Sequence, residues 1–104
     1  MILFNLLTLN GQHAREATNL LLLEHLATDV FVDDAIANYR LNADGTVGTE
    51  PLYRVIFLTK ALLCRHIEDL LSKAFPDNDF RVYTTAVPHV NDAEAERIRG
   101  LRLA

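Results

Sequence analysis

The sequence has no tryptophan and only one cysteine, one methionine and one serine among its 104 residues. The lone Cys64 cannot form an internal disulfide, which is typical of a protein from a reducing compartment. With Ser72 as the only serine and no G-x-S-x-G element, the chain offers no recognisable nucleophile–base pair. The sequence therefore predicts a protein that is not an enzyme.

Positive charge is also scarce, because ten Lys and Arg residues stand against fourteen Asp and Glu residues, for a net charge of −4. Binding to DNA or RNA requires a basic surface, so no nucleic-acid partner is expected. No apolar run approaches the roughly 18 residues of a membrane-spanning helix. The start Met1-Ile-Leu-Phe lacks the positive charge that opens a signal peptide. We expect a cytoplasmic protein with no membrane partner.

Hydrophobic residues, in contrast, make up half of the chain and follow a strand–helix–strand pattern twice. The first unit is Ile2–Leu9, Gln12–Ala27 and Val30–Leu41, and the second is Tyr53–Lys60, Leu62–Phe75 and Phe80–Val87. Asn91 followed by Glu94 is an N-cap signal for a short C-terminal helix that ends near Arg102. The pattern predicts one α+β domain over residues 1–104, a ferredoxin-like split βαβ-βαβ antiparallel sheet with two helices on one face.

The two long helical segments differ in how their apolar residues are distributed. Those of the second helix fall on one arc, as expected for a helix that lies on a sheet. In the first helix, Leu20-Leu21-Leu22-Leu23 spreads apolar surface around the whole circumference. This distribution predicts that the first helix is buried on more than one side.

A long hairpin is expected between the two units. Asp44-Gly45 is a hairpin signal, because glycine accepts the positive φ that a primed turn requires. The strands on either side are about ten residues long against a typical five or six, so the hairpin should project past the sheet. Asp is a poor strand former, and Asp33-Asp34 is therefore expected to mark a bulge or a solvent-facing bend.

The first and third strands, which lie in the middle of such a sheet, are apolar on both faces. One face would be covered by the two helices, and the other would leave Leu, Ile and Phe side chains in water. At about 25 cal/mol per Å², covering several such side chains contributes free energies in the kcal/mol range. We infer that another subunit covers the open face; the alternative is that the C-terminal helix folds over it.

Four short segments of this chain resemble the CutA family of divalent-cation tolerance proteins, which belong with the PII-like trimeric folds. These segments are Leu26-Ala27, Tyr39-Arg40, Val55–Lys60 and Phe75-Pro76. In the family they correspond to a Leu-Ala-Ala-Cys-Val-Asn strand entry, a Tyr-Arg-Trp strand, a Leu-Leu-Ile-Lys-Thr strand and a His-Pro-Tyr turn. The resemblance implies a ferredoxin-like homotrimer in which each hairpin pairs with a neighbour.

This chain departs from the family pattern at several positions. Asp29 stands where the family usually has Cys, Leu41 replaces the Trp, and Phe75 and Asp77 replace the His and the Tyr. A PII-type nucleotide site is not expected either, because the connection Asn42–Thr46 is tight and no Gly-rich anion cradle occurs. No cofactor is predicted.

Predicted geometry and family resemblance together favour a regulatory or small-ligand-binding site in clefts between subunits. There the hairpin of one subunit would cross the fourth strand of the next, and the ligand would be a small anion or a partner protein. The residues assigned to this site are Tyr39, Arg40, Tyr53, Arg81, Tyr83 and His89. The alternative is a divalent-metal site for Cu or Zn, or an ion-tolerance role, with His89, Asp29, Asp33 and Asp34 as ligands.

Overall fold

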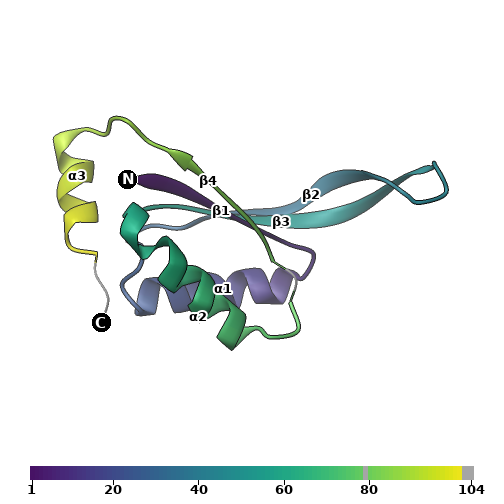
Figure 1. Ribbon diagram of the computed structural model, residues 1–104, viewed down its shortest axis with the longest axis horizontal. Coiled ribbons are helices and arrows are strands. Elements are labelled where there is room, and N and C mark those ends of the chain that lie inside the picture. Colours follow the sequence, from purple (N-terminus) through teal and green to yellow (C-terminus); the bar gives the residue numbers. More distant parts are fainter. Residues whose placement is uncertain (79, 102–104) are drawn as a thin grey trace.

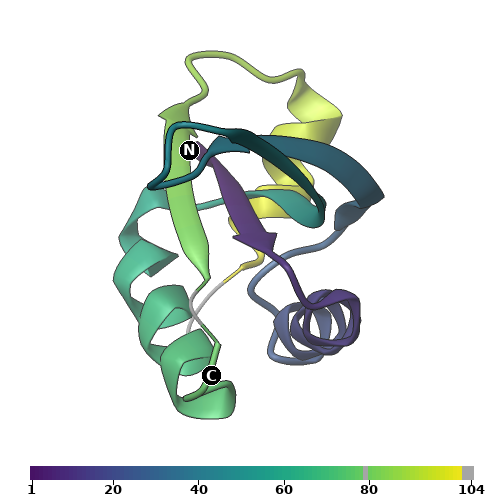
Figure 2. The same cartoon turned by 90° about the vertical axis from the view of Figure 1, so that its right-hand side faces the viewer.

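The computed structural model describes residues 1–78 and 80–101. Its four strands form one antiparallel sheet in the order β2-β3-β1-β4, and α1 and α2 lie side by side on one face (Figures 1 and 2). The elements are β1 (Ile2–Thr8), α1 (Gly11–Leu23), β2 (Phe31–Leu41), β3 (Val47–Thr59), the 3₁₀ turn η1 (Ala61–Leu63), α2 (Cys64–Ala74), β4 (Arg81–Ala86) and α3 (Asp92–Arg99). The predicted fold class and the central position of the first and third strands are confirmed.

The core lies between the sheet and the two helices. Phe4 of β1 and Phe57 of β3 are fully buried, and their rings stack with centroids 4.9 Å apart. Both helices contribute small or branched apolar side chains that fit against these rings. The helix residues buried in this way are Ala14, Ala17, Leu21, Ile67 and Leu71.

Helix α1 ends earlier than the sequence predicts, at Leu23 instead of Ala27. His25 adopts a left-handed conformation with φ of 57°, and the N–H groups of His25 and Leu26 donate to the carbonyls of Leu22 and Leu21. This pair of bonds is a Schellman cap, which normally uses glycine or asparagine at the left-handed position. The cap is completed by burial of Leu26 in the core.

The expectation that α1 is buried on more than one side is wrong for the single chain. Leu21 is buried, but Leu23 is 78% exposed and Leu22 is also exposed. The helix packs on the sheet along the stripe of Ala14, Ala17 and Leu21, with Leu20 partly buried beside the core, and Leu22 and Leu23 face outward.

The hairpin of β2 and β3 projects well beyond the sheet, as predicted, and gives the molecule a long axis of 49 Å against 29 and 20 Å (Figure 1). Its turn is a three-residue loop and not the primed two-residue turn that the sequence indicated. The N–H of Gly45 donates to the carbonyl of Asn42, and Gly45 has φ of 87°. A type I turn followed by a left-handed glycine matches the twist of the strands, so the glycine is required one position later than expected.

Asp44 gives this turn a pH dependence. The hydroxyl and the N–H of Thr46 donate to Asp44 Oδ1 at 2.6 and 3.0 Å, and these bonds hold the Asp44 pKa below its ordinary value of 3.8. Because the pKa of Asp44 is lower in the folded state, its ionised carboxylate stabilises the folded protein. This stabilisation is complete above the ordinary pKa and is lost as pH falls through the lowered value. In an NMR titration we expect the Asp44 midpoint to rise when Thr46→Val removes the hydroxyl; an unchanged midpoint would contradict this account.

A β-bulge interrupts β2 at the predicted acidic pair. Asp33 pairs with Arg54 and Ile36 pairs with Leu52, so two residues of β2 face one residue of β3. Ala35, inside the bulge, has φ of 51°. The bulge predicted at Asp33-Asp34 is confirmed.

The sheet face opposite α1 and α2 carries many apolar side chains. Strand alternation places Leu3, Leu7, Ile56 and Leu58 on this face, because their neighbours Phe4, Leu6, Val55 and Phe57 face the helices. We call it the open face. Helix α3 lies at one end of the sheet and does not extend over the centre of this face (Figure 1).

Helix α3 is held at that end by Ile98 and Leu101, which are buried in the core. It begins as predicted, with Asn91 Oδ1 accepting from the Glu94 N–H at 2.9 Å, and it ends at Arg99. Its predicted end near Arg102 lies outside the described residues. Within the part of the chain that is described, no helix is both long and apolar enough to cross a membrane.

Candidate functional site

A cavity of about 220 Å³ lies where β1 begins, β2 begins and α3 begins. Its walls are mostly apolar, with two acidic side chains among them. The lining residues are Leu3, Thr28, Asp29, Phe31, Phe57, Leu58, Val87 and Glu94. An adjoining groove shares four of these residues and adds Val90, Asn91 and Arg97.

The two carboxylates of this cavity come from distant parts of the chain. Asp29 precedes β2, and Glu94 lies in the first turn of α3, where Asn91 caps the helix. Among the residues that the structure describes, Glu94 has one weak ion pair, to Arg97 at 3.5 Å, and Asp29 accepts from the Thr28 hydroxyl at 3.3 Å. Oxygen donors that retain lone pairs at the rim of a cavity are suited to binding a cation.

The other residues predicted as metal ligands do not join Asp29 in the single chain. Asp33 is engaged by Arg54, whose Nε and Nη2 donate to its Oδ2 at 3.0 and 2.7 Å. Asp34 is exposed in the bulge, and His89 is exposed between β4 and α3. Residues 1–78 and 80–101 contain no group of three His, Cys, Asp or Glu side chains that could hold one metal ion.

Nor does the single chain bring the predicted small-ligand residues together in one place. Tyr39 is 72% exposed on the projecting hairpin, and Arg40 is paired with Glu50 at 2.7 Å. Tyr53 lies at the hairpin's base, where its ring packs closely against Gly11. Arg81 and Tyr83 lie on β4, opposite Leu7 and Asn5 of β1, and His89 follows that strand.

Sequence reasoning did not single out Arg54, which lies on the open face. Its guanidinium pairs with Asp33, and that hydrogen bond, with a smaller contribution from Tyr83, raises the Arg54 pKa above its ordinary value. Arg54 directly precedes the apolar run Val55–Leu58, and this position was a visible signal. A charged side chain beside such a run requires an acidic partner on the neighbouring strand. Glu94 was predicted only as a capping residue, and its place at the cavity that Asp29 also lines depends on the path of the chain after β4.

No family model and no curated protein matches this sequence. Solved structures do match it closely in shape. The divalent ion tolerance protein CutA1 from Ehrlichia chaffeensis has 17% identity and a TM-score of 0.82, over 94% of this chain and 91% of its own. The divalent cation tolerance protein from Thermus thermophilus has 14% identity and a TM-score of 0.82, over 97% and 98% of the two chains.

A third match corrects the predicted location. The CutA protein of Archaeoglobus fulgidus, with 14% identity, a TM-score of 0.78 and coverage of 95% and 96%, is described as periplasmic. The prediction of a cytoplasmic protein is therefore contradicted, since proteins of this fold also occur outside the cytoplasm. The resemblance seen in the sequence is confirmed at the level of the fold, which is that of the CutA1 proteins.

Proposed function

We propose that this chain is a divergent CutA-type protein that binds divalent cations and has no catalytic activity. The observation that carries the proposal is that Asp29 and Glu94 line one cavity in a chain with the CutA1 fold. Solved proteins of this fold are described by their tolerance of divalent ions, which supports the same reading. The ion is the cargo of the protein and not a reactant.

The donors at the cavity favour hard cations. Carboxylate oxygens suit Mg²⁺, Ca²⁺ and Mn²⁺, whereas thiolate and imidazole select Cu and Zn. Neither Cys nor His is among the residues that line the cavity. Since Asp29 stands where the family usually has Cys, the exchange of sulfur for oxygen moves the preference of this site toward Mn²⁺ and Ca²⁺.

Two carboxylates from one chain do not complete the coordination of a divalent ion, which takes six or more oxygen ligands in the case of Ca²⁺. Water and a second copy of the chain are the available sources of further donors. We propose a homotrimer that is joined through the open face and the hairpin. The exposed apolar residues Phe31, Leu41 and Val47 support such an assembly, because each is more than two-thirds exposed in the single chain.

A small-anion site between subunits is the second candidate. Arg81 and Tyr83 lie together on the open face of β4, which favours anion binding there, whereas Arg54 on the same face is already paired with Asp33. Arg40 is less suited to the task because Glu50 already pairs with it. This candidate ranks below the cation site because its residues come together only if the hairpin of a neighbour reaches β4.

Removal of either carboxylate should weaken cation binding. In calorimetric titrations with MnCl₂ we expect Asp29→Asn and Glu94→Gln each to raise the dissociation constant about tenfold, because each change removes a charged ligand. Asp34→Asn is the matched control, since Asp34 is an exposed carboxylate in the bulge. Absence of Mn²⁺ and Ca²⁺ binding by the unaltered protein, or equal loss in Asp34→Asn, would overturn the assignment.

A further inference from the structure

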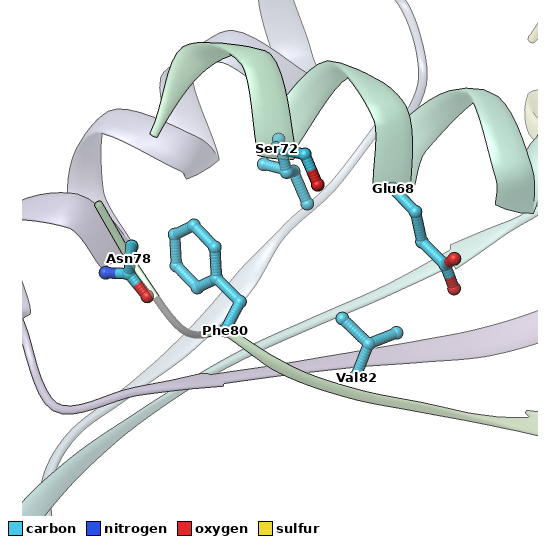
Figure 3. A pocket seen from close by; sticks show the side chains of 6 residues that line it. Glu68, Ser72, Asn78, Phe80 and Val82 are labelled. Carbon is cyan, nitrogen blue, oxygen red and sulfur yellow. The ribbon is translucent and has the colours of Figure 1, made fainter. Parts of the chain in front are cut away.

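A second hollow lies between α2 and β4, on the helix side of the sheet, and has a volume of about 410 Å³. Figure 3 shows Glu68 and Ser72 pointing into it from α2, with Phe80 and Val82 rising from the strand side and Asn78 at one end. Leu71 completes the lining. The hollow shares no lining residue with the Asp29–Glu94 cavity.

The polar groups of this hollow accept hydrogen bonds. Asn78 uses its Nδ2 on Thr8 Oγ1 and His13 Nδ1, at 3.0 and 2.6 Å, which leaves its Oδ1 as the available atom. Glu68 receives one hydrogen bond from the described residues, a weak one from the Cys64 thiol at 3.8 Å. Of the six lining residues only Glu68 carries a charge, so the chemistry of the hollow favours a cationic donor.

Cys64 does not supply a competing charge. Burial raises the pKa of its thiol, and the nearby Glu68 carboxylate raises it further. The thiol therefore stays protonated at neutral pH and points its weak donor at Glu68. Glu68 is exposed on α2, so a stronger, charged donor can replace the thiol at its carboxylate.

The aromatic ring of Phe80 fits the same kind of ligand. It is fixed by an edge-to-face contact with Phe75, with centroids 5.5 Å apart and planes at 86°. A flat cation above such a ring is attracted by its π electrons, and guanidinium stacks on aromatic rings in this way. Glu68 and Ser72 are one helical turn apart, which separates them by roughly 6 Å along the helix axis. Several N–H donors on one planar group can span this spacing.

We propose that this hollow binds a small organic guanidinium compound, with its N–H groups donating to Glu68 and Ser72 and its plane against Phe80. A simple ammonium ion lacks both the planar face and the number of spread donors. The site stands apart from the proposed divalent-cation site, so either can fail without the other.

The test is a titration of the full chain with butylguanidine and, separately, with butylamine, followed by NMR shifts of Ser72 and Phe80 and by calorimetry. We expect millimolar or tighter binding of butylguanidine, weaker binding of butylamine, and about a tenfold loss of butylguanidine affinity in Glu68→Gln. Asp69→Asn, an exposed neighbour on α2 that does not line the hollow, should bind as the unaltered protein does.

The outcomes separate clearly. Equal affinity of Glu68→Gln and the unaltered chain, or no shift at Ser72 and Phe80 at millimolar butylguanidine, would overturn the proposal. Equal binding of the two probes would also overturn it, because the planar group would then play no part. Amide NMR shifts of Glu68→Gln that match those of the unaltered chain away from the hollow show that the variant is folded, whatever the outcome at the Asp29–Glu94 site.

Discussion

Replacement of Ile56 by glutamate is expected to dissociate the protein into monomers. Ile56 lies on β3 at the middle of the open face, opposite Asn5 of β1 and Phe31 of β2. It is half-buried in the single chain, so the new carboxylate stays in water there. In an assembly that covers the open face the same carboxylate would lose its water without gaining a partner, which costs several kcal/mol.

The measurement is the mass in solution by light scattering over a dilution series. The unaltered protein should have a stable mass near three times the 11.7 kDa of the chain, and Ile56→Glu should have the mass of one chain. Leu23→Glu is the matched control, because Leu23 is 78% exposed on α1 and lies away from the open face. If the unaltered protein is itself a monomer, or if Ile56→Glu keeps the full mass, the open face is not the interface.

The second large effect is expected in the core, where Phe4→Ala should lower the free energy of unfolding by about 3–5 kcal/mol. Phe4 is fully buried on a central strand, and its ring stacks on that of Phe57. Removing the ring loses both the buried apolar area and this stacking, and the strands on either side cannot close the space. For a domain with roughly 5–15 kcal/mol of total stability, this loss approaches the point of unfolding.

Urea denaturation at one fixed protein concentration measures this effect, since association adds to the apparent stability. Leu62→Ala serves as the control because Leu62 is 76% exposed, and its effect should stay within about 0.5 kcal/mol. If both variants lost a similar amount of unfolding free energy, the Phe4–Phe57 pair would not be central to the core. If Phe4→Ala does not fold, Phe4→Leu takes its place, and a smaller destabilisation is expected for it.

Much of the fold could be predicted from the sequence because its signals are local. Alternation and helical periodicity gave the order of the elements, Asn91 marked the start of α3, and the acidic pair at Asp33 marked the bulge. The end of α1 was missed because His25 takes a conformation that glycine usually takes. The tertiary packing of Leu26 fixes that conformation, and periodicity alone does not show it.

The sites depend on contacts between distant segments and were harder to predict. Asp29 was recognised as a candidate ligand, but Glu94 lies sixty-five positions later and lines the same cavity only because the chain folds back after β4. Asp33 was predicted as a metal ligand because the sequence shows the carboxylate but not the arginine that pairs with it. The strand register places Arg54 directly across from it and removes it from that role.

The bulge in β2 also determines which changes of length the hairpin tolerates. Beyond it, Ile36–Leu41 runs in register with β3 to the turn, with side chains alternating between the two faces of the ribbon. Deletion of one bulge residue would restore simple pairing and leave the faces of Tyr39 and Arg40 unchanged, because their partners Thr49 and Gly48 on β3 set those faces. Insertions or deletions in the β2–β3 hairpin should therefore survive in evolution as matched pairs on both strands. Relatives should then differ in hairpin length by even numbers of residues and keep the faces of the side chains at the tip.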